Sequence, residues 1–191
     1  MTRRPRITVL SGGTGTPKLI SGFNYLKNIE LTVIANTGDD WNFYGLHVSP
    51  DVDAVLLLLS DHLDTDKFWG IKNDTFHLVE FLKKIGENVW FNLGDMDAGL
   101  CLFRTYLMQQ GNSLTSVTRT IVKRLGIRHS VLPMCNEPVE CRFKTSSGDL
   151  HLEEYWIKER GKPVIQSQYL KGIEDTTITT DVRKAIQAAD L

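Results

Sequence analysis

Residues 6–18 (RITVLSGGTGTPK) combine residue types suited to holding a phosphate group. The run from Ile7 to Leu10 predicts a buried strand, and a helix is predicted after Pro17, which suits a first helical position. Glycines let backbone N–H groups turn toward an anion, and a helix N-terminus adds partial positive charge. We therefore expect a nucleotide-like phosphate to bind at Gly12, Gly13, Thr14, Gly15 and Thr16.

This glycine loop differs from the two common nucleotide-binding motifs. A P-loop would need Gly-Lys-Ser/Thr, which does not follow here. In the dinucleotide fingerprint Gly13 and Gly15 fit, but Lys18 stands where the third glycine belongs. The alternative is a tight turn that contacts no ligand.

Three pairs of aspartates form the second chemical feature. Carboxylate oxygens are ligands for Mg²⁺, which bridges phosphate oxygens. Aspartates also favour turns and first helical turns, so each pair alone has a structural explanation. Together with the glycine loop they predict that at least one pair binds metal or substrate. The pairs are Asp39 with Asp40, Asp51 with Asp53, and Asp95 with Asp97.

No side chain is recognisable as a covalent nucleophile. The chain has no G-x-S-x-G motif, and its histidines are scattered. Cys101 lies between two leucines and is interpreted as a core residue. Direct displacement at a metal-bound phosphate is then the simplest chemistry. Four aromatic residues could stack on a planar ligand or pack under long loops: Trp41, Phe43, Tyr44 and Trp69.

The order of predicted elements is that of an α/β protein with a parallel sheet and flanking helices. We expect one domain over residues 1–191, with a β-hairpin excursion at 139–160 around the turn 146–149. An aromatic loop is expected at 41–50, and irregular or extended chain at 161–179. Strands are predicted at 7–10, 31–35 and 130–133, and helices at 17–26, 50–60, 75–86, 95–110, 114–125 and from 180 to the end; Ser49, and Asn73 or Asp74, are the expected N-caps.

Composition excludes several classes of protein. The 191 residues are 41% hydrophobic and 24% charged. Their net charge of −1 means that the chain has no excess of positive charge for binding nucleic acid. The longest apolar run, 55–59, is too short to span a bilayer. Three cysteines without metal-type spacing favour a reducing cytoplasm.

Six segments in register resemble one known family. They are SGGTGTPKL (11–19), NTGDD (36–40), GLHVSPDVD (45–53), WGIKNDTF (69–76), LGDMD (93–97) and LPM (132–134). Together they resemble the CofD family, the 2-phospho-L-lactate transferases of coenzyme F₄₂₀ biosynthesis, over essentially the whole chain. The resemblance implies a Rossmann-like fold and a Mg²⁺-dependent transferase. A phospholactyl or phosphoenolpyruvyl group would pass from lactyl- or enolpyruvyl-diphosphoguanosine to Fo, 7,8-didemethyl-8-hydroxy-5-deazariboflavin, releasing GMP.

The resemblance also implies roles for individual residues. Asp39 and Asp53 would hold Mg²⁺ and position the Fo hydroxyl, with Asp40 and Asp51 as alternatives. Asp53 would accept the proton as that hydroxyl attacks the β-phosphorus. Asn92 stands at a usually basic position that contacts Fo. The residues expected at the donor and its phosphates are Gly12, Gly13, Thr14, Gly15, Thr16, Lys18, Asn36, Asn73, Asp74 and Thr75.

The chain departs from the family in two further respects. Cys135-Asn136-Glu137 replaces a serine and paired aspartates. Family members continue for roughly another hundred residues, so we expect a C-terminally truncated member. A homodimer is expected from the family alone. The alternative function is a regulator of the same fold that binds a uridine-diphosphate sugar. Residues 49–53 and 69–76 and the aromatic loop 41–44 favour the transferase.

Overall fold

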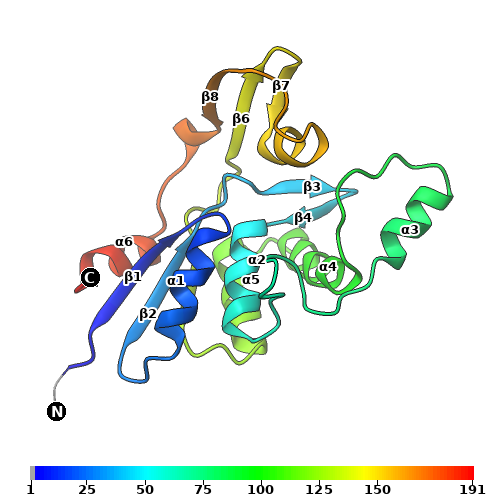
Figure 1. Cartoon of the computed structure of the whole chain (residues 1–191). Helices are drawn as coiled ribbons and strands as arrows, with labels where there is room; N and C mark the ends of the chain where they lie inside the picture. Colours follow the sequence, from blue (N-terminus) through cyan, green and yellow to red (C-terminus); the bar gives the residue numbers. More distant parts are fainter. Residues whose placement is uncertain (1–2) are drawn as a thin grey trace.

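A computed structural model describes residues 3–191 and places a parallel three-stranded sheet at its centre (Figure 1). The strand order is β1-β2-β5, with Ile7 beside Leu31 and Val33 beside Val131. The predicted α/β class with a parallel sheet is therefore confirmed. The strands are β1 (Arg6–Ser11), β2 (Glu30–Ala35) and β5 (Ser130–Pro133).

Helices cover both faces of this sheet. Ile20 of α1, Val55 of α2 and Ile121 of α5 form one core with the apolar residues of the strands. On the other face Val182 of α6 packs against Ile34 and Leu132. No helix within residues 3–191 has the length and apolar character needed to cross a bilayer. The helices are α1 (Gly15–Asn24), α2 (Pro50–Leu59), α3 (His77–Lys84), α4 (Asp95–Gln109), α5 (Leu114–Arg124) and α6 (Thr180–Ala188).

Two helix starts and two helix caps differ from the predictions. α1 begins at Gly15, so Pro17 is its third residue rather than its first. α2 begins at Pro50 as predicted, but the Ser49 side chain does not cap it. α3 begins at His77 rather than at residue 75, and its N-cap residue is Phe76, without a side-chain cap, rather than Asn73 or Asp74.

Residues 41–48 form a β-hairpin where the sequence predicted an aromatic loop. Its strands β3 (Trp41–Phe43) and β4 (Leu46–Val48) are joined by Tyr44 and Gly45, which both have positive φ angles, 48° and 88°. Positive φ at both central residues is the requirement of a type I′ hairpin turn. Phe43 and Val48 are buried against Val79 and Cys101. The prediction failed because the packing partners come from α3 and α4, far along the chain.

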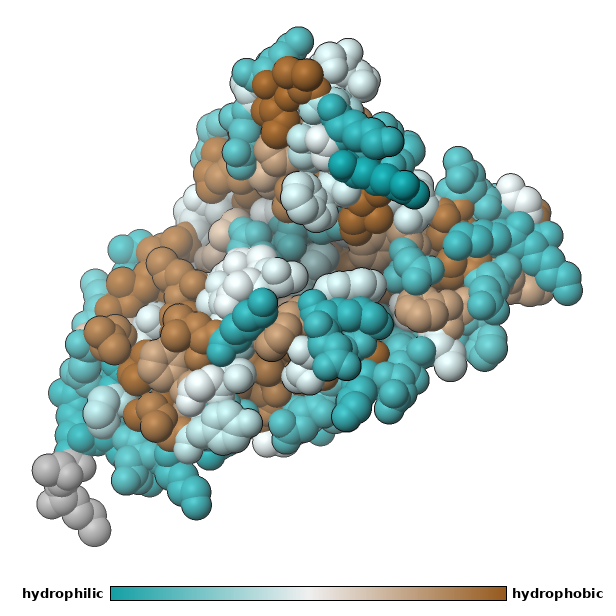
Figure 2. Space-filling model, viewed as in Figure 1, coloured by the Kyte–Doolittle hydropathy of each residue, from teal (hydrophilic) through white to brown (hydrophobic). Residues whose placement is uncertain are grey.

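A small antiparallel sheet stands apart from the main sheet (Figures 1 and 2). Its order is β7-β6-β8, so the predicted hairpin is present but gains a third strand from a region predicted to be irregular or extended. The excursion therefore extends beyond residue 160, because β8 pairs with β6. Its elements are β6 (Glu140–Thr145), β7 (Gly148–His151), the π-helix η1 (Glu154–Lys158) and β8 (Ile165–Lys171), followed by the 3₁₀ turn η2 (Ile173–Asp175).

The starts of α3 and α4 cap each other. Asp74 lies before α3 and accepts hydrogen bonds from the backbone N–H groups of Met96 and Asp97 in α4, at 2.9 and 3.1 Å. Asp95 in α4 accepts from His77 and Leu78 in α3, at 3.0 and 2.8 Å. Each carboxylate satisfies N–H groups that a helix start leaves unpaired, and the exchange fixes α3 to α4.

We predict that Gly94→Ala weakens this junction. A methyl group at residue 94 would lie 2.6 Å from Cγ of Asp74 and would displace the capping carboxylate. We expect a loss of about 1–3 kcal/mol in the free energy of unfolding, measured by urea denaturation. Gly99→Ala, also in the α4 segment, is the control, because a methyl group there meets nothing within 4 Å. Equal midpoints for the two variants would contradict the assignment.

Candidate phosphate and metal site

The carboxylate of Asp51 joins three segments of the chain. It lies in the first turn of α2 and is 8% exposed. It accepts a hydrogen bond from the Gly13 N–H at 2.6 Å and from Nδ2 of Asn36 at 2.9 Å. The loop after β1, the loop after β2 and the start of α2 therefore meet at one anionic group, at the carboxyl end of the sheet.

Asp39 lies beside Asp51 in the same buried site. Nδ2 of Asn36 also approaches Oδ1 of Asp39, at 3.4 Å. Burial, followed by the charges of Asp51, Asp40 and Glu153, raises the pKa of Asp39 to about 9. Burial also raises the pKa of Asp51, while hydrogen bonds that include one with Asp39 lower it. Near neutral pH the two carboxyl groups therefore share a proton.

Glu153 brings the small sheet to this site, a role that the sequence did not predict. It follows β7, and burial together with the charge of Asp51 raises its pKa to about 7. The amide of Cys141 in β6 also donates a hydrogen bond to the Gly38 carbonyl, which ties the small sheet to the loop after β2. No local pattern around Glu153 indicated this contact.

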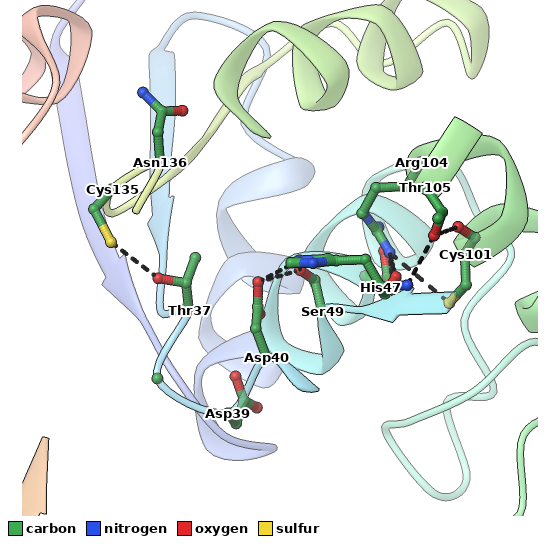
Figure 3. Close-up of polar contacts among 12 residues, drawn as sticks. Thr37, Asp39, Asp40, His47, Ser49, Cys101, Arg104, Thr105, Cys135 and Asn136 are labelled. Carbon is green, nitrogen blue, oxygen red and sulfur yellow. Dashed lines mark hydrogen bonds and ion pairs between the residues drawn. The ribbon is translucent and has the colours of Figure 1, made fainter. Parts of the chain in front are cut away.

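Asp40, His47 and Ser49 form a compact polar group next to this carboxylate pair (Figure 3). Oδ2 of Asp40 lies 2.8 Å from Nε2 of His47 and accepts from the Ser49 hydroxyl at 2.6 Å. The Ser49 hydroxyl lies 3.2 Å from the same nitrogen of His47. A hydrolytic triad would use both imidazole nitrogens, and Ser49 is fully buried. The group therefore orients Asp40 and is not a nucleophile.

Asp53 points away from this site into a buried ion pair with Arg104. Nη1 of Arg104 donates to Oδ2 of Asp53 at 3.1 Å, and Nη2 donates to Oδ1. Nη1 also donates to the His47 carbonyl at 3.3 Å, and the Arg104 side chain is fully buried. The metal and catalytic roles expected for Asp53 stay predictions. Its occupied oxygens favour Asp51 as the partner of Asp39.

The sequence alone could have indicated that Arg104 is buried and needs an anionic partner. Ala98, Cys101 and Arg104 are the buried residues of α4 and follow at intervals of three. An arginine within a buried helical stripe needs an anionic partner, because an unpaired buried charge is costly. The prediction that Cys101 is a core residue is confirmed, since it is 1% exposed.

The glycine loop lies at the N-terminus of α1, and its backbone is exposed. The residues from Gly12 to Gly15 are exposed, and no side chain caps the helix at Thr14. The hydroxyl of Thr16 donates to the Gly12 carbonyl at 3.0 Å. Lys18 does not take part in these contacts: its ammonium lies 4.9 Å from the ring centroid of Phe68.

Two further residues expected at the donor, Asp74 and Thr75, lie at the junction of α3 and α4. Asp74 and Thr75 are engaged with α4, where the Thr75 hydroxyl donates to Asp95 at 2.6 Å. Burial and the charges of Asp53 and Asp74 raise the pKa of Asp97 to about 7. Asn73 and Asn92 are exposed. The donor and acceptor roles expected for these four residues stay predictions.

The paired carboxylates fit a hard divalent cation. Their buried negative charge has no cationic side chain beside it in the contacts described above, and carboxylate oxygens suit Mg²⁺. Within residues 3–191 no three histidine, cysteine or acidic side chains are grouped closely enough to hold a metal by themselves. Mg²⁺ commonly uses one or two carboxylates together with water and substrate phosphates, which matches Asp39 and Asp51.

Comparison with known proteins identifies relatives over nearly the whole chain. The family model described as "2-phospho-L-lactate transferase CofD" matches residues 7–191. The 2-phospho-L-lactate transferase of Methanopyrus kandleri is 41% identical over 187 residues, which are 97% of this chain and 60% of that protein. The enzyme of the same name from Methanosarcina mazei is 38% identical over 180 residues, 94% of this chain and 59% of that protein.

A solved structure shares the fold. Protein BH3568 from Bacillus halodurans, described as a member of the UPF0052 family, superposes with a TM-score of 0.64 at 21% identity. The match covers 100% of this chain and 58% of that one. This likeness concerns the fold alone. The chain spans about 60% of the length of the curated relatives named above.

We predict that Arg104→Met strongly destabilises the fold. Removing one partner of a buried ion pair leaves the other charge uncompensated and costs about 3–5 kcal/mol. In the double variant Asp53→Leu/Arg104→Met both charges are absent, so the free energy of unfolding should partly recover. Arg119→Ala, which breaks an exposed ion pair with Asp181, is the control and should cost about 0–1 kcal/mol. A similar small loss for Arg104→Met would contradict the prediction.

We predict that protonation of Asp39 makes stability fall as pH rises. The folded protein holds this proton up to about pH 9, whereas the usual aspartate pKa is 3.8. The folded state binds the proton more tightly than the unfolded state between these values. The free energy of unfolding should therefore decline there by at most about 1.4 kcal/mol per pH unit.

Asp39→Asn should reduce this decline, measured by urea denaturation in metal-free buffer between about pH 5 and pH 9. Asp66→Asn changes an exposed aspartate and should leave the decline as in the unsubstituted protein. Identical pH profiles for the two variants would show that Asp39 does not carry the effect.

Proposed function

Because the chain belongs to the CofD family of 2-phospho-L-lactate transferases, we propose that it binds a guanosine-diphosphate-activated donor and the deazaflavin Fo. It would transfer a phospholactyl or phosphoenolpyruvyl group to Fo and release GMP in coenzyme F₄₂₀ biosynthesis. The observation that supports this most directly is the buried pair Asp39 and Asp51, bonded to the glycine loop through Gly13.

The glycine loop is suited to the donor's phosphates. The exposed, uncapped start of α1 presents backbone N–H groups and the positive end of the helix dipole. The backbone of Gly12 passes close to the same carboxylate, since a methyl group at residue 12 would lie 3.4 Å from Oδ2 of Asp51. These features favour an anion that approaches the loop from the side of Asp51.

Mg²⁺ would be held by Asp39 and Asp51 and would supply positive charge against the donor's phosphates. The chain's contribution is to give up the proton that these two carboxyl groups share. Asn36 then holds both carboxylates in place through its amide. Asp40, oriented by His47 and Ser49, adds further negative potential at the same edge.

The transfer requires an acceptor for the proton of the attacking hydroxyl. The hydroxyl oxygen of Fo would form a bond to the β-phosphorus, and the bond from that phosphorus to the oxygen of GMP would break. Glu153 is suited to take the proton, because its pKa of about 7 lets it exchange a proton near neutral pH and the charge of Asp51 acts on it. The ion pair with Arg104 makes Asp53 the less available base.

Ligand binding tests this proposal. We expect GDP to bind in the presence of Mg²⁺ and Fo to bind the same protein, both measured by calorimetry. Asp51→Asn should weaken GDP by about tenfold or more, because the loss of one carboxylate charge weakens the metal site and a charge-assisted bond to Gly13. Asp66→Asn is the control and should bind GDP normally.

Two results would contradict the proposal. One is the absence of Fo binding by the folded, unsubstituted protein. The other is a preference for a uridine-diphosphate sugar over GDP, which would instead favour the nucleotide-sugar-binding regulator.

A further inference from the structure

A cavity lies at the amino ends of β2 and β5, at the opposite edge of the sheet from the carboxylate site. Figure 1 shows that β1 and β2 begin at this edge, beside the N-terminus. The volume of the cavity is about 360 Å³, within the range of sites that enclose a small molecule, about 300–1,000 Å³. Strand β2 has six residues, so about 17–20 Å separate this cavity from the loop after β2.

The lining of this cavity is rich in positive charge. Arg4, Lys27 and Arg128 line it together with one acidic residue, Glu30. None of the three cations forms an ion pair with a carboxylate among residues 3–191. Because the whole chain has a net charge of −1, this positive excess is local. It favours the binding of an anion.

The guanidinium of Arg128 is held in a fixed orientation at the cavity. Its Nε donates a hydrogen bond to Nε2 of His129 at 3.0 Å. Its Nη2 donates to the carbonyl oxygen of Asn24 and, at 3.3 Å, to Oδ1 of the same residue. None of these bonds uses Nη1, so both N–H groups of Nη1 remain for a ligand. An oriented guanidinium of this kind is suited to charge-assisted hydrogen bonds with a phosphate group.

His129 can support Arg128 only in its neutral form. Nε of an arginine always carries its hydrogen, so Nε2 of His129 has to be the acceptor and the ring proton lies on Nδ1. His129 is 8% exposed, and burial, followed by the charge of Arg128, lowers its pKa. The ring is therefore neutral near pH 7 and orients the guanidinium without repelling it. A solvated surface arginine does not need such a buried support.

The cavity lining also includes apolar side chains. Leu26 and Ile29, from the segment between α1 and β2, line the cavity together with the cationic residues. Leu26 is 47% exposed, so a ligand that covers it would remove apolar surface from water. An inorganic anion would leave this surface uncovered. The combination suits an anion that carries an apolar body.

We propose that this cavity binds an organic phosphate, a small molecule that carries a phosphate group on an apolar body. Arg128 would hold the phosphate through Nη1, and Arg4 and Lys27 would supply further charge-assisted hydrogen bonds. The apolar body would pack against Leu26 and Ile29. This second anion site is separate from the glycine loop and does not depend on the proposed function.

Calorimetry with phenyl phosphate in Mg²⁺-free buffer tests the proposal, because this probe combines a phosphate group with an apolar ring. We expect saturable binding of phenyl phosphate, weaker binding of inorganic phosphate, which lacks the apolar contact, and no binding of phenol.

Substitutions locate the bound probe. Arg4→Gln/Lys27→Gln should raise the Kd for phenyl phosphate about tenfold or more, because two charged donors are lost. Both side chains are exposed, so the fold should be retained. Lys83→Gln/Lys84→Gln is the matched control, because it removes the same charge from the last turn of α3, which does not line the cavity. This control should leave the Kd unchanged.

NMR of the histidine rings gives a second readout on the unsubstituted protein. The His129 signal, identified by its loss in His129→Gln, should shift as phenyl phosphate is added, because His129 lines the cavity and contacts Arg128. The signal of His77 in α3 should not shift.

Three results would overturn the proposal: no saturable binding of phenyl phosphate, an unchanged His129 signal at saturation, or equal Kd values for the two double variants. Inorganic phosphate that binds as tightly as phenyl phosphate would overturn the role of the apolar side chains.

Discussion

The position of the Asp51 carboxylate constrains the rest of the site. A buried carboxylate is stable only when hydrogen-bond donors surround it, and here they come from Gly13 and Asn36 on two separate loops. These two hydrogen bonds to Asp51 therefore fix the glycine loop and the loop after β2 against the start of α2. The same arrangement buries Asp39 next to Asp51, and this burial, followed by the surrounding negative charge, raises the pKa of Asp39 so that it keeps a proton. A site in that state is prepared to exchange the proton for a cation.

Helix geometry explains why Asp51 and Asp53 have different roles. Residues two positions apart on a helix of 3.6 residues per turn point about 200° apart. Asp51 faces the glycine loop, so Asp53 has to face the opposite side, where Arg104 of α4 meets it. One helix start thus supports a candidate ligand site on one side and a buried ion pair with α4 on the other. The ion pair also holds β4 through the His47 carbonyl, next to the group that orients Asp40.

The sequence was sufficient for the elements whose signals are local. The apolar runs of β1, β2 and β5 and the periodic stripe of α5 predicted their types and most of their boundaries. The hairpin at 41–48 and the strand β8 were missed, because their stability comes from distant partners. For the same reason the sequence could propose Asp39 and Asp53, with Asp51 as an alternative, but could not find Glu153. The spacing of Arg104 from Cys101 was enough to predict that Arg104 is buried. The sequence did not indicate that its partner is Asp53.

The candidate site depends on a proton on Asp39 that a bound cation and phosphate replace. Calorimetry of Mg²⁺ and GDP binding near pH 7.5, repeated in buffers of different ionisation enthalpy, counts protons released on binding. We expect release of about one proton per chain, because the pKa of Asp39 is about 9 before binding, and no such release in Asp39→Asn. Binding of Mg²⁺ and GDP by the unsubstituted protein with no proton released would contradict it.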